Sequence, residues 1–112
     1  VGADRVARNG DVANKVGTRA LAIIAQYHGV PFYVAAPLST FDPDARSGSA
    51  IPIEERSEDE LRMFNGLAVV ATEAKIHNPA FDITPADLIS GIVTEHDILR
   101  PPFEETIPGS FR

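Results

Sequence analysis

The chain has 112 residues, a common size for one domain and enough to bury a single hydrophobic core. Hydrophobic residues make up 44% and charged residues 23%, so intrinsic disorder, collagen and coiled coil are poor fits. The formal net charge of −6 argues against nucleic acid and anionic membrane as partners. The chain has no cysteine, and no apolar run approaches the ~20 residues of a membrane span. We expect a cytoplasmic domain.

The first four residues, Val-Gly-Ala-Asp, are typical of the end of a buried strand whose beginning lies upstream. We therefore expect the chain to be the C-terminal part of a longer polypeptide. A loop over residues 5–11 follows, with Asn9-Gly10 as its turn.

An amphipathic helix is expected from Val12 to Tyr27, where apolar residues recur at spacings of three and four. Asp11 fits the N-cap of this helix, and Gly29 fits the position just after it. Residues 30–36 are almost wholly apolar, which predicts a strand covered on both faces, as in a parallel sheet. Strand, helix and strand in this order form a βαβ unit, whose crossover is expected to be right-handed.

The middle of the chain is less regular. Residues 39–50 are rich in Asp, Ser, Pro and Gly, which predicts an exposed loop. Residues 51–56 alternate in polarity, as in a short strand or an extended arm. Ser57 and Glu60 match a capping box that opens one or two helical turns. Residues 67–70 are apolar and are expected to be extended.

A second helix start is expected at Thr84, with Pro85 at the first helical position and Asp87 at the third. This helix should end near Ser90, and a short buried strand should follow at residues 92–94.

The final residues, 101–112, hold three of the nine prolines and are expected to form a surface arm that touches a partner subunit. Together these elements predict an α/β fold with a Rossmann-like, mostly parallel sheet flanked by helices.

Asp4, Asn14 and Lys15 form the candidate site. In an open parallel sheet, ligands bind beyond the carboxyl ends of the strands, where Asp4 is expected. Asn14 and Lys15 fall in the first turn of the expected helix, where free N–H groups and the helix dipole favour an anion. Such a set suits a phosphorylated or polyhydroxylated small molecule, with Lys15 for charge, Asn14 for oxygens and Asp4 for moving a proton. Because the dipole repels a lysine there, Lys15 makes most sense if an anion fills the crevice.

An alternative without a ligand stays open. In it, Asp4 pairs with Arg5 or Arg19, and Asn14 and Lys15 are ordinary polar residues of a first helical turn.

Other candidates carry less. His28, His77 and His96 lack the spacing of metal ligands, so no metal site is expected. The sequence G-x-G-x-x-G is absent, so no nicotinamide cofactor is implied. Asp82 either approaches the cleft at the carboxyl edge of the sheet or only orders its own turn.

Four separated blocks resemble the family of 5-methylthioribose-1-phosphate isomerases in order and in spacing. They are GADRVARNGDVANKVGT (residues 2–18), PFYVAAP (31–37), IPIEER (51–56) and NPAFDITPADLISGIVTE (78–95). Enzymes of this family act in methionine salvage, where they convert an aldose 1-phosphate into the ketose, methylthioribulose 1-phosphate.

The resemblance implies roles for the candidate residues. Asp4 takes the place of the acid/base residue of the isomerisation, and Asn14 and Lys15 take the place of a pair that contacts the sugar-phosphate substrate. The family's catalytic cysteine, phosphate-binding arginines, N-terminal helical domain and first strands are expected upstream. Residues 1–112 would then be the C-terminal portion of one Rossmann-like domain, inactive when isolated. The family also implies a homodimer and no metal or organic cofactor.

The implied reaction is an aldose–ketose isomerisation in which phosphate blocks the anomeric oxygen, so the sugar cannot simply open to a free aldehyde. A proton or a hydride must move between the first two carbons while the ring opens, and Asp4 is placed to donate or accept a proton. An enolate route and a hydride shift both stay open.

Two related groups share parts of this pattern. Ribose-1,5-bisphosphate isomerases usually read NGA-x-INK where this chain reads NGDVANK. The regulatory alpha, beta and delta subunits of the exchange factor for translation initiation factor two lose the catalytic aspartate. Asp4, Asp11, Ala13 and the IPIEER block favour the methylthioribose enzyme. A non-catalytic sugar-phosphate or nucleotide sensor stays open, because the catalytic cysteine lies outside this sequence.

Overall fold

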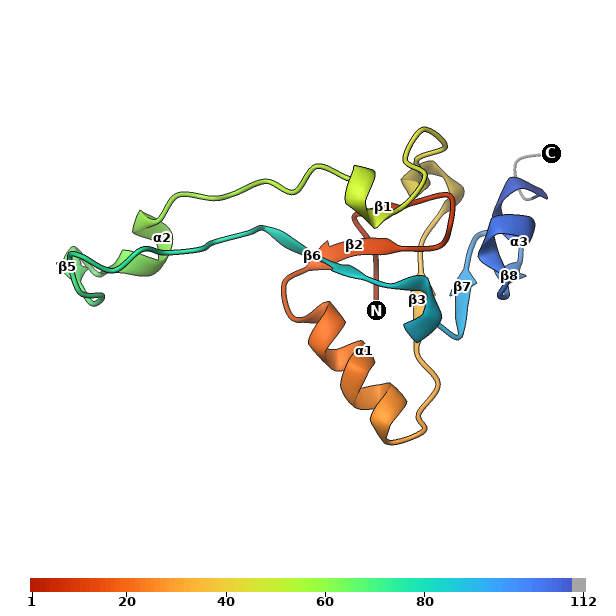
Figure 1. Ribbon diagram of the computed structural model, residues 1–112, viewed down its shortest axis with the longest axis horizontal. Coiled ribbons are helices and arrows are strands. Elements are labelled where there is room, and N and C mark those ends of the chain that lie inside the picture. The colour runs from red at the N-terminus through yellow and green to blue at the C-terminus, as the bar shows by residue number, and fades with distance from the viewer. Residues whose placement is uncertain (110–112) are drawn as a thin grey trace.

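Two three-stranded sheets and two helices surround the main hydrophobic core in the computed structural model, which describes residues 1–109 (Figure 1). The first sheet has the order β1-β2-β6, the second has the order β3-β7-β8, and β4 pairs with β5 in an arm. The strands are β1 (Arg5–Val6), β2 (Val12–Lys15), β3 (Tyr33–Ala35), β4 (Met63–Phe64), β5 (Leu67–Ala68), β6 (Phe81–Thr84), β7 (Gly91–Val93) and β8 (Ile98–Leu99). The helices are α1 (Thr18–Tyr27), α2 (Asp59–Arg62) and α3 (Phe103–Gly109), and the 3₁₀ turns are η1 (Leu38–Thr40), η2 (Gly48–Ala50) and η3 (Ala86–Leu88). No helix among the described residues is both long and apolar enough to cross a membrane.

The first sheet shows that the helix start predicted at Val12 is wrong. Residues 12–15 form strand β2, which pairs antiparallel with both β1 and β6, and α1 begins only at Thr18. Val12 and Ala13 are both fully buried, because their side chains enter two apolar clusters on opposite faces of the sheet. Gly17, in the left-handed region at φ 107°, then turns the chain into the helix.

The hairpin between β1 and β2 turns at Asn9-Gly10, as predicted. Gly10 has φ 92°, and its N–H donates to the carbonyl oxygen of Ala7 at 3.0 Å. The Asn9 side-chain oxygen accepts a hydrogen bond from the Asp11 N–H at 3.0 Å. The turn signal is therefore satisfied by contacts within the loop itself.

The second sheet contains a parallel pair, β3 with β7, while β8 runs antiparallel to β7. The strand expected at residues 92–94 is confirmed as β7, and the strand expected at residues 30–36 is confirmed as the shorter β3. Only one face of β3 is covered, since Val34 is buried whereas Tyr33 and Ala35 are exposed.

The start of the chain lies along the other edge of β3. The Val1 ammonium donates to the carbonyl oxygen of Tyr33 at 3.0 Å, and the Val1 carbonyl oxygen accepts from the N–H of Ala35 at 2.8 Å. This pattern, with both bonds flanking Val34, is that of a parallel pair. Even so, antiparallel pairs predominate in the described residues, so they form a mixed α/β fold and not the mostly parallel Rossmann-like sheet that we expected.

The helix predicted from Thr84 is also wrong, because Thr84 ends β6 and only the single turn η3 follows. The Thr84 Oγ1 is buried and caps no helix, since it has no hydrogen-bond partner among the described residues. Soon after η3, the Ser90 N–H donates to the Phe32 carbonyl oxygen at 2.7 Å, and the Ser90 hydroxyl accepts from the Phe32 N–H at 2.9 Å. These bonds draw the chain into β7 beside β3 before more helical turns can form.

The C-terminal residues complete the core instead of forming the predicted surface arm. Phe103 and Ile107 of α3 lie one helical turn apart and are almost fully buried. They belong to the same cluster as Val34 and Ile92 of the second sheet. The part of that prediction that concerns residues 110–112 lies outside the described residues.

A long arm, residues 52–79, extends from the body on the side opposite α3, with α2, β4 and β5 near its tip (Figure 1). The extended start of this arm and its single helical turn agree with the predictions for residues 51–56 and for the turn that follows. β5 confirms the first half of the extended segment expected at residues 67–70. The tip exposes large apolar side chains, namely Leu61, Met63, Phe64, Leu67 and Val69.

The capping box expected at the start of α2 does not form. Glu60 pairs with the guanidinium of Arg56 instead of the backbone of Ser57. The Ser57 hydroxyl accepts a hydrogen bond from the Asp59 N–H at 3.2 Å, two residues on, which is a local turn contact and neither of the two bonds of the motif.

The loop expected at residues 39–50 is only partly exposed. It contains η1 and η2, and it buries Phe41, Ala45 and Gly48 against the two apolar clusters. The polar composition of this loop therefore gives no sign of the three residues that it buries.

Gly10 gives a test of this packing, because a Cβ at that position would lie 2.5 Å from the Phe103 Cδ2. We expect Gly10→Ala to lower the free energy of unfolding of the full-length protein by about 1–2 kcal/mol for the left-handed backbone. Overpacking against α3 should add about 1–3 kcal/mol. Gly29→Ala is the matched control, since Gly29 has φ 67° but no atom within 4 Å of its Cβ position. Equal losses for the two variants in denaturant titrations would contradict the contact between Gly10 and Phe103.

Candidate functional site

Polar residues of three neighbouring segments meet on the first sheet. In the register of β2 with β6, Asn14 lies directly opposite Asp82, so the two side chains share one face of the sheet. Asp4 immediately precedes the pair Arg5–Ala13 of β1 and β2, and its N–H donates to the Ala13 carbonyl oxygen at 2.8 Å. The structure therefore places Asp4 at the end of β2 that carries Asn14, through strand pairing and not through a helix start.

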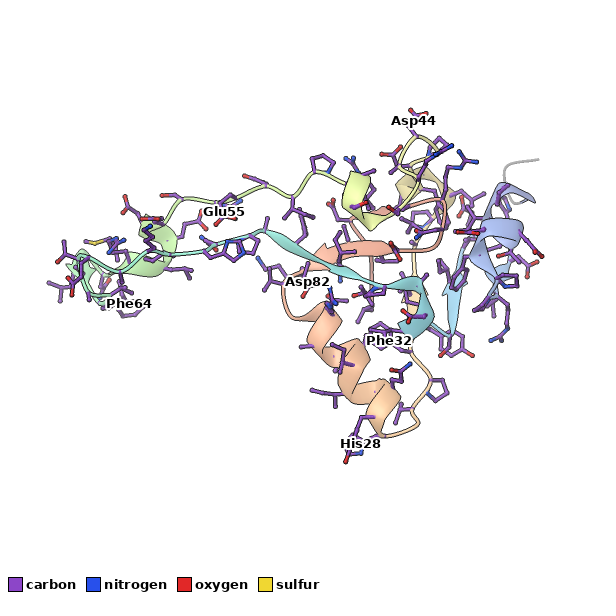
Figure 2. All side chains as sticks on the ribbon, viewed as in Figure 1. His28, Phe32, Asp44, Glu55, Phe64 and Asp82 are labelled. Carbon is purple, nitrogen blue, oxygen red and sulfur yellow. The ribbon has the colours of Figure 1, made fainter. Side chains whose placement is uncertain are left out.

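Asp82 binds the beginning of α1, where Figure 2 shows it above the first helical turn. Its Oδ2 accepts a hydrogen bond from the Gly17 N–H at 2.8 Å, and its two oxygens accept from the Arg19 N–H at 3.2 and 3.3 Å. The chain's own carboxylate thus occupies the helix N-terminus that the sequence predicted for a ligand anion. Of the two roles considered for Asp82, ordering its own turn is wrong, because the turn that it orders lies more than sixty positions earlier.

Asn14 is half-buried at the end of β2, and one side of its carboxamide is engaged. Its Nδ2 donates to the Thr18 hydroxyl at 3.0 Å, and that hydroxyl donates to the Lys15 carbonyl oxygen at 2.7 Å. Thr18 is itself buried, so this short chain of bonds fixes the end of the strand to the start of α1. The Asn14 Oδ1 has no hydrogen bond within residues 1–109 and remains an acceptor for a ligand.

Lys15 does not share a face with Asn14. Consecutive residues of a strand point to opposite faces, and Lys15 is exposed opposite Phe81. It lies in a strand and not in a first helical turn, so no helix dipole repels its ammonium there, contrary to the prediction. Its positive charge helps to lower the pKa of the Glu60 carboxyl on the arm.

Asp4 is exposed, and the ligand-free alternative proposed for it is not seen. Arg5 forms its ion pair with Asp42 at 3.3 Å, and no ion pair to Asp4 is present among the described residues. The carboxylate of Asp4 is therefore available to solvent or to a ligand.

Asp11 joins three loops and is not a helix N-cap. Its Oδ2 accepts hydrogen bonds from the Gly48 N–H at 2.8 Å and from the Asn9 Nδ2 at 3.0 Å. Its Oδ1 accepts from the Ala86 N–H at 2.9 Å. The hairpin turn, η2 and η3 are thereby fastened to one half-buried carboxylate.

The arm carries a second charged cluster beside α2. The Arg56 Nη2 lies 2.7 Å from the Glu60 Oε1, and its Nε donates to the Glu60 Oε2 at 2.8 Å. These hydrogen bonds are the main reason that the pKa of the Glu60 carboxyl lies below its usual value, and the Lys15 ammonium adds to the effect. His77 pairs with Glu55 at 3.2 Å on the opposite segment of the arm.

The described residues offer no metal site, and their apolar pocket lies away from the polar residues above. No group of three His, Asp or Glu side chains in residues 1–109 is placed to hold a metal ion. An apolar pocket of about 320 Å³ lies between the first hairpin, residues 41–43 and α3, and none of the candidate residues lines it.

Comparison with known proteins places the chain among relatives of greater length. Residues 1–101 match the model of the initiation factor 2 subunit family. The methylthioribose-1-phosphate isomerase of Caldicellulosiruptor saccharolyticus is 60% identical over 107 residues, which are 96% of this chain and 31% of that protein. The chain thus spans about a third of the length of the curated relatives it matches.

Two solved structures have a similar fold. The crystal structure of 5-methylthioribose 1-phosphate isomerase from Pyrococcus horikoshii matches with a TM-score of 0.91 at 46% identity, covering 99% of this chain and 31% of that one. The structure of the delta subunit of translation initiation factor eIF-2B from A. fulgidus matches with a TM-score of 0.88 at 40% identity, covering 97% and 32%.

The ion pair between Arg56 and Glu60 of α2 predicts a pH dependence. Because the folded protein lowers the pKa of Glu60, the pair stabilises the arm above the usual carboxyl pKa, and this contribution is lost as pH falls through the lowered value. NMR titration of the full-length protein should place the Glu60 midpoint below its usual value, and Arg56→Met should raise it. Arg62→Met, which removes the neighbouring pair with Glu58, should leave the Glu60 midpoint in place. An unchanged midpoint in Arg56→Met would contradict this reading of the cluster.

Proposed function

This chain belongs to the initiation factor 2 subunit family, and we propose that the protein of which it is part is a methylthioribose-1-phosphate isomerase. The observation that carries the proposal is that the similarity to isomerases of this name extends over nearly the whole chain. The exposed carboxylate of Asp4 beside Asn14 adds chemical support, because the reaction needs a group that exchanges a proton. The resemblance to this family also supports a place in methionine salvage.

We propose further that residues 1–112 are the C-terminal portion of one Rossmann-like domain. The parallel bonding of β3 with both Val1 and β7 supports this, because adjacent parallel strands are typical of such a domain. The outer side of α1 also exposes Leu21, Ile23 and Ile24, which a larger domain would cover.

In the proposed reaction, 5-methylthioribose 1-phosphate becomes 5-methylthioribulose 1-phosphate with no change in composition. The hydrogen on the second carbon moves to the first carbon, and the bond from the first carbon to the ring oxygen breaks. The ring oxygen gains a proton, and the hydroxyl of the second carbon loses one as it becomes the carbonyl. Asp4 is proposed to carry one of these protons, and the sequence and geometry support an enolate route and a hydride shift equally.

Asn14 and Lys15 are proposed to bind the substrate. The free Oδ1 of Asn14 is an acceptor for a sugar hydroxyl, and Asn14 directly follows Ala13, whose carbonyl oxygen accepts the Asp4 N–H. Lys15 approaches from the other face of β2 and would need its long side chain to reach the phosphate around the end of the strand. The family resemblance also supports a cytoplasmic homodimer that turns over without an added cofactor.

A regulatory subunit that binds without catalysis is the second candidate. The likeness to the delta subunit of eIF-2B from A. fulgidus favours it, since that likeness covers almost the same share of this chain. A ribose-1,5-bisphosphate isomerase is a further alternative, distinguished by its substrate.

The proposed function is tested with Asp4→Asn in the full-length protein. The parent should convert methylthioribose 1-phosphate, and the variant should lose about 10²–10⁴-fold in turnover, because an amide cannot exchange the proton. The KM should change far less. A parent without isomerase activity would refute the enzyme and leave the regulatory subunit, and near-parent turnover in the variant would make Asp4 a structural residue.

Lys15→Met tests the binding role of the ammonium. Because Lys15 is exposed and not at a helix start, the variant should melt at nearly the parent temperature. The loss of one charge-assisted contact should weaken binding of the ketose phosphate by about 1.5–3 kcal/mol, roughly tenfold to a hundredfold. The measurement is the shift in melting temperature on adding that product. A parent-like shift would remove Lys15 from the site.

A further inference from the structure

We propose that Asp82 is a positioning residue of this site, which holds the turn between β2 and α1 and, through that turn, the carboxamide of Asn14. The inference rests on the proposed function for its catalytic consequence, and on the described contacts for its mechanism. Asp82 itself is not proposed to touch the substrate.

The first step is the contact of Asp82 with the turn. Its carboxylate accepts the N–H groups of Gly17 and Arg19, on either side of the first residue of α1. Gly17 has a left-handed backbone, so the direction of the chain changes sharply between strand and helix. Both hydrogen bonds are exposed to solvent, and water can satisfy the two donors if the carboxylate is removed. Removing the carboxylate should therefore loosen the turn more than it destabilises the whole protein.

The second step connects the turn to Asn14. The Asn14 Nδ2 is bonded to the hydroxyl of Thr18, which is the first residue of α1 and follows Gly17 directly. Asn14 also lies opposite Asp82 in the sheet. The strand end is thus held from two sides, by the pairing with β6 and by the first residue of the helix. Movement of the helix start would reorient the carboxamide whose Oδ1 is free for the substrate.

The third step is the need for a carboxylate. Hydrogen bonds from N–H groups to a charged oxygen are roughly twice as strong as neutral ones. A carboxylate also offers two acceptor atoms, whereas the amide of Asn offers one acceptor and one donor group. Asp82→Asn keeps the size of the side chain, but it loses the charge and turns an N–H group toward other N–H donors. This variant therefore tests the acceptor function without opening a cavity.

Asp11, directly before β2, provides a matched control. It is also a half-buried carboxylate that accepts two backbone N–H groups, those of Gly48 and Ala86, at 2.8 and 2.9 Å. It precedes β2 at the end remote from Lys15, and its contacts fasten the hairpin turn, η2 and η3 and not α1. Asp11→Asn should therefore destabilise the protein at least as much as Asp82→Asn while leaving the site in place.

The experiment compares the two variants in the full-length protein, well below their melting temperatures. For Asp82→Asn we expect kcat to fall about tenfold to a hundredfold, as for misplaced substrate contacts, with KM changed less than kcat. For Asp11→Asn we expect a lower melting temperature and a kcat close to that of the parent. A parent-like kcat in Asp82→Asn, or an equal fall in both variants, would overturn the positioning role.

A second measurement separates this inference from the proposed function. Amide exchange at Gly17 and Arg19, and the NMR signals of the Asn14 side-chain amide, should change in Asp82→Asn and not in Asp11→Asn. If the parent has no isomerase activity, the proposed function fails, and these signals still decide whether Asp82 positions Asn14. Unchanged signals in Asp82→Asn would refute the positioning mechanism even in an active enzyme.

Discussion

The antiparallel pairing of β2 with β6 is the interaction on which the rest of this structure depends. It joins an early segment of the chain to a late one, and it directs Val12 and Ala13 into apolar clusters on opposite faces. The same strand β6 contacts α1, and its residue Asp82 binds the start of that helix. One strand pair thus places the core, the helix and the polar residues of the site relative to one another. A shift of its register by one residue would turn every side chain of the shifted strand to the opposite face of the sheet.

Residues 12–27 show how far local patterns can determine this fold. Their apolar spacing fits one long helix. Residues 18–27 are helical, but residues 12–15 form a strand that pairs with β6. Gly17 is the one local signal of a break, and it does not show that the residues before it pair as a strand, because the deciding partner lies far along the chain. The turn at Asn9-Gly10 and the strands β3 and β7 were predictable, since their signals are short-range. The helix signals at Thr84 failed because the hydrogen bonds of the following chain with Phe32 leave room for only one turn.

The candidate site was predictable in part for the same reason. Asp4 does lie at the end of β2 that carries Asn14, because the short hairpin between β1 and β2 keeps residues that are close in sequence close in space. Lys15 was expected to share their crevice, but in a strand it turns to the other face. Asp82 shows no local sign of its contact, since the N–H groups that it accepts lie 63 and 65 positions away.

The carboxylate at the start of α1 also limits how a sugar phosphate can lie in the proposed site. The N–H groups of Gly17 and Arg19 are already bonded to Asp82, so a phosphate there would have to displace that charge and would be repelled by it. Asp82 opposite Asn14, and Asp4 at the same end of β2, make this part of the sheet acidic, which suits sugar hydroxyls and a moving proton better than a dianion. On the proposed function, the phosphate therefore needs cations away from this part of the sheet. Lys15, on the other face of β2, is one candidate in an acidic chain of net charge −6, and any further cations would come from the rest of the polypeptide.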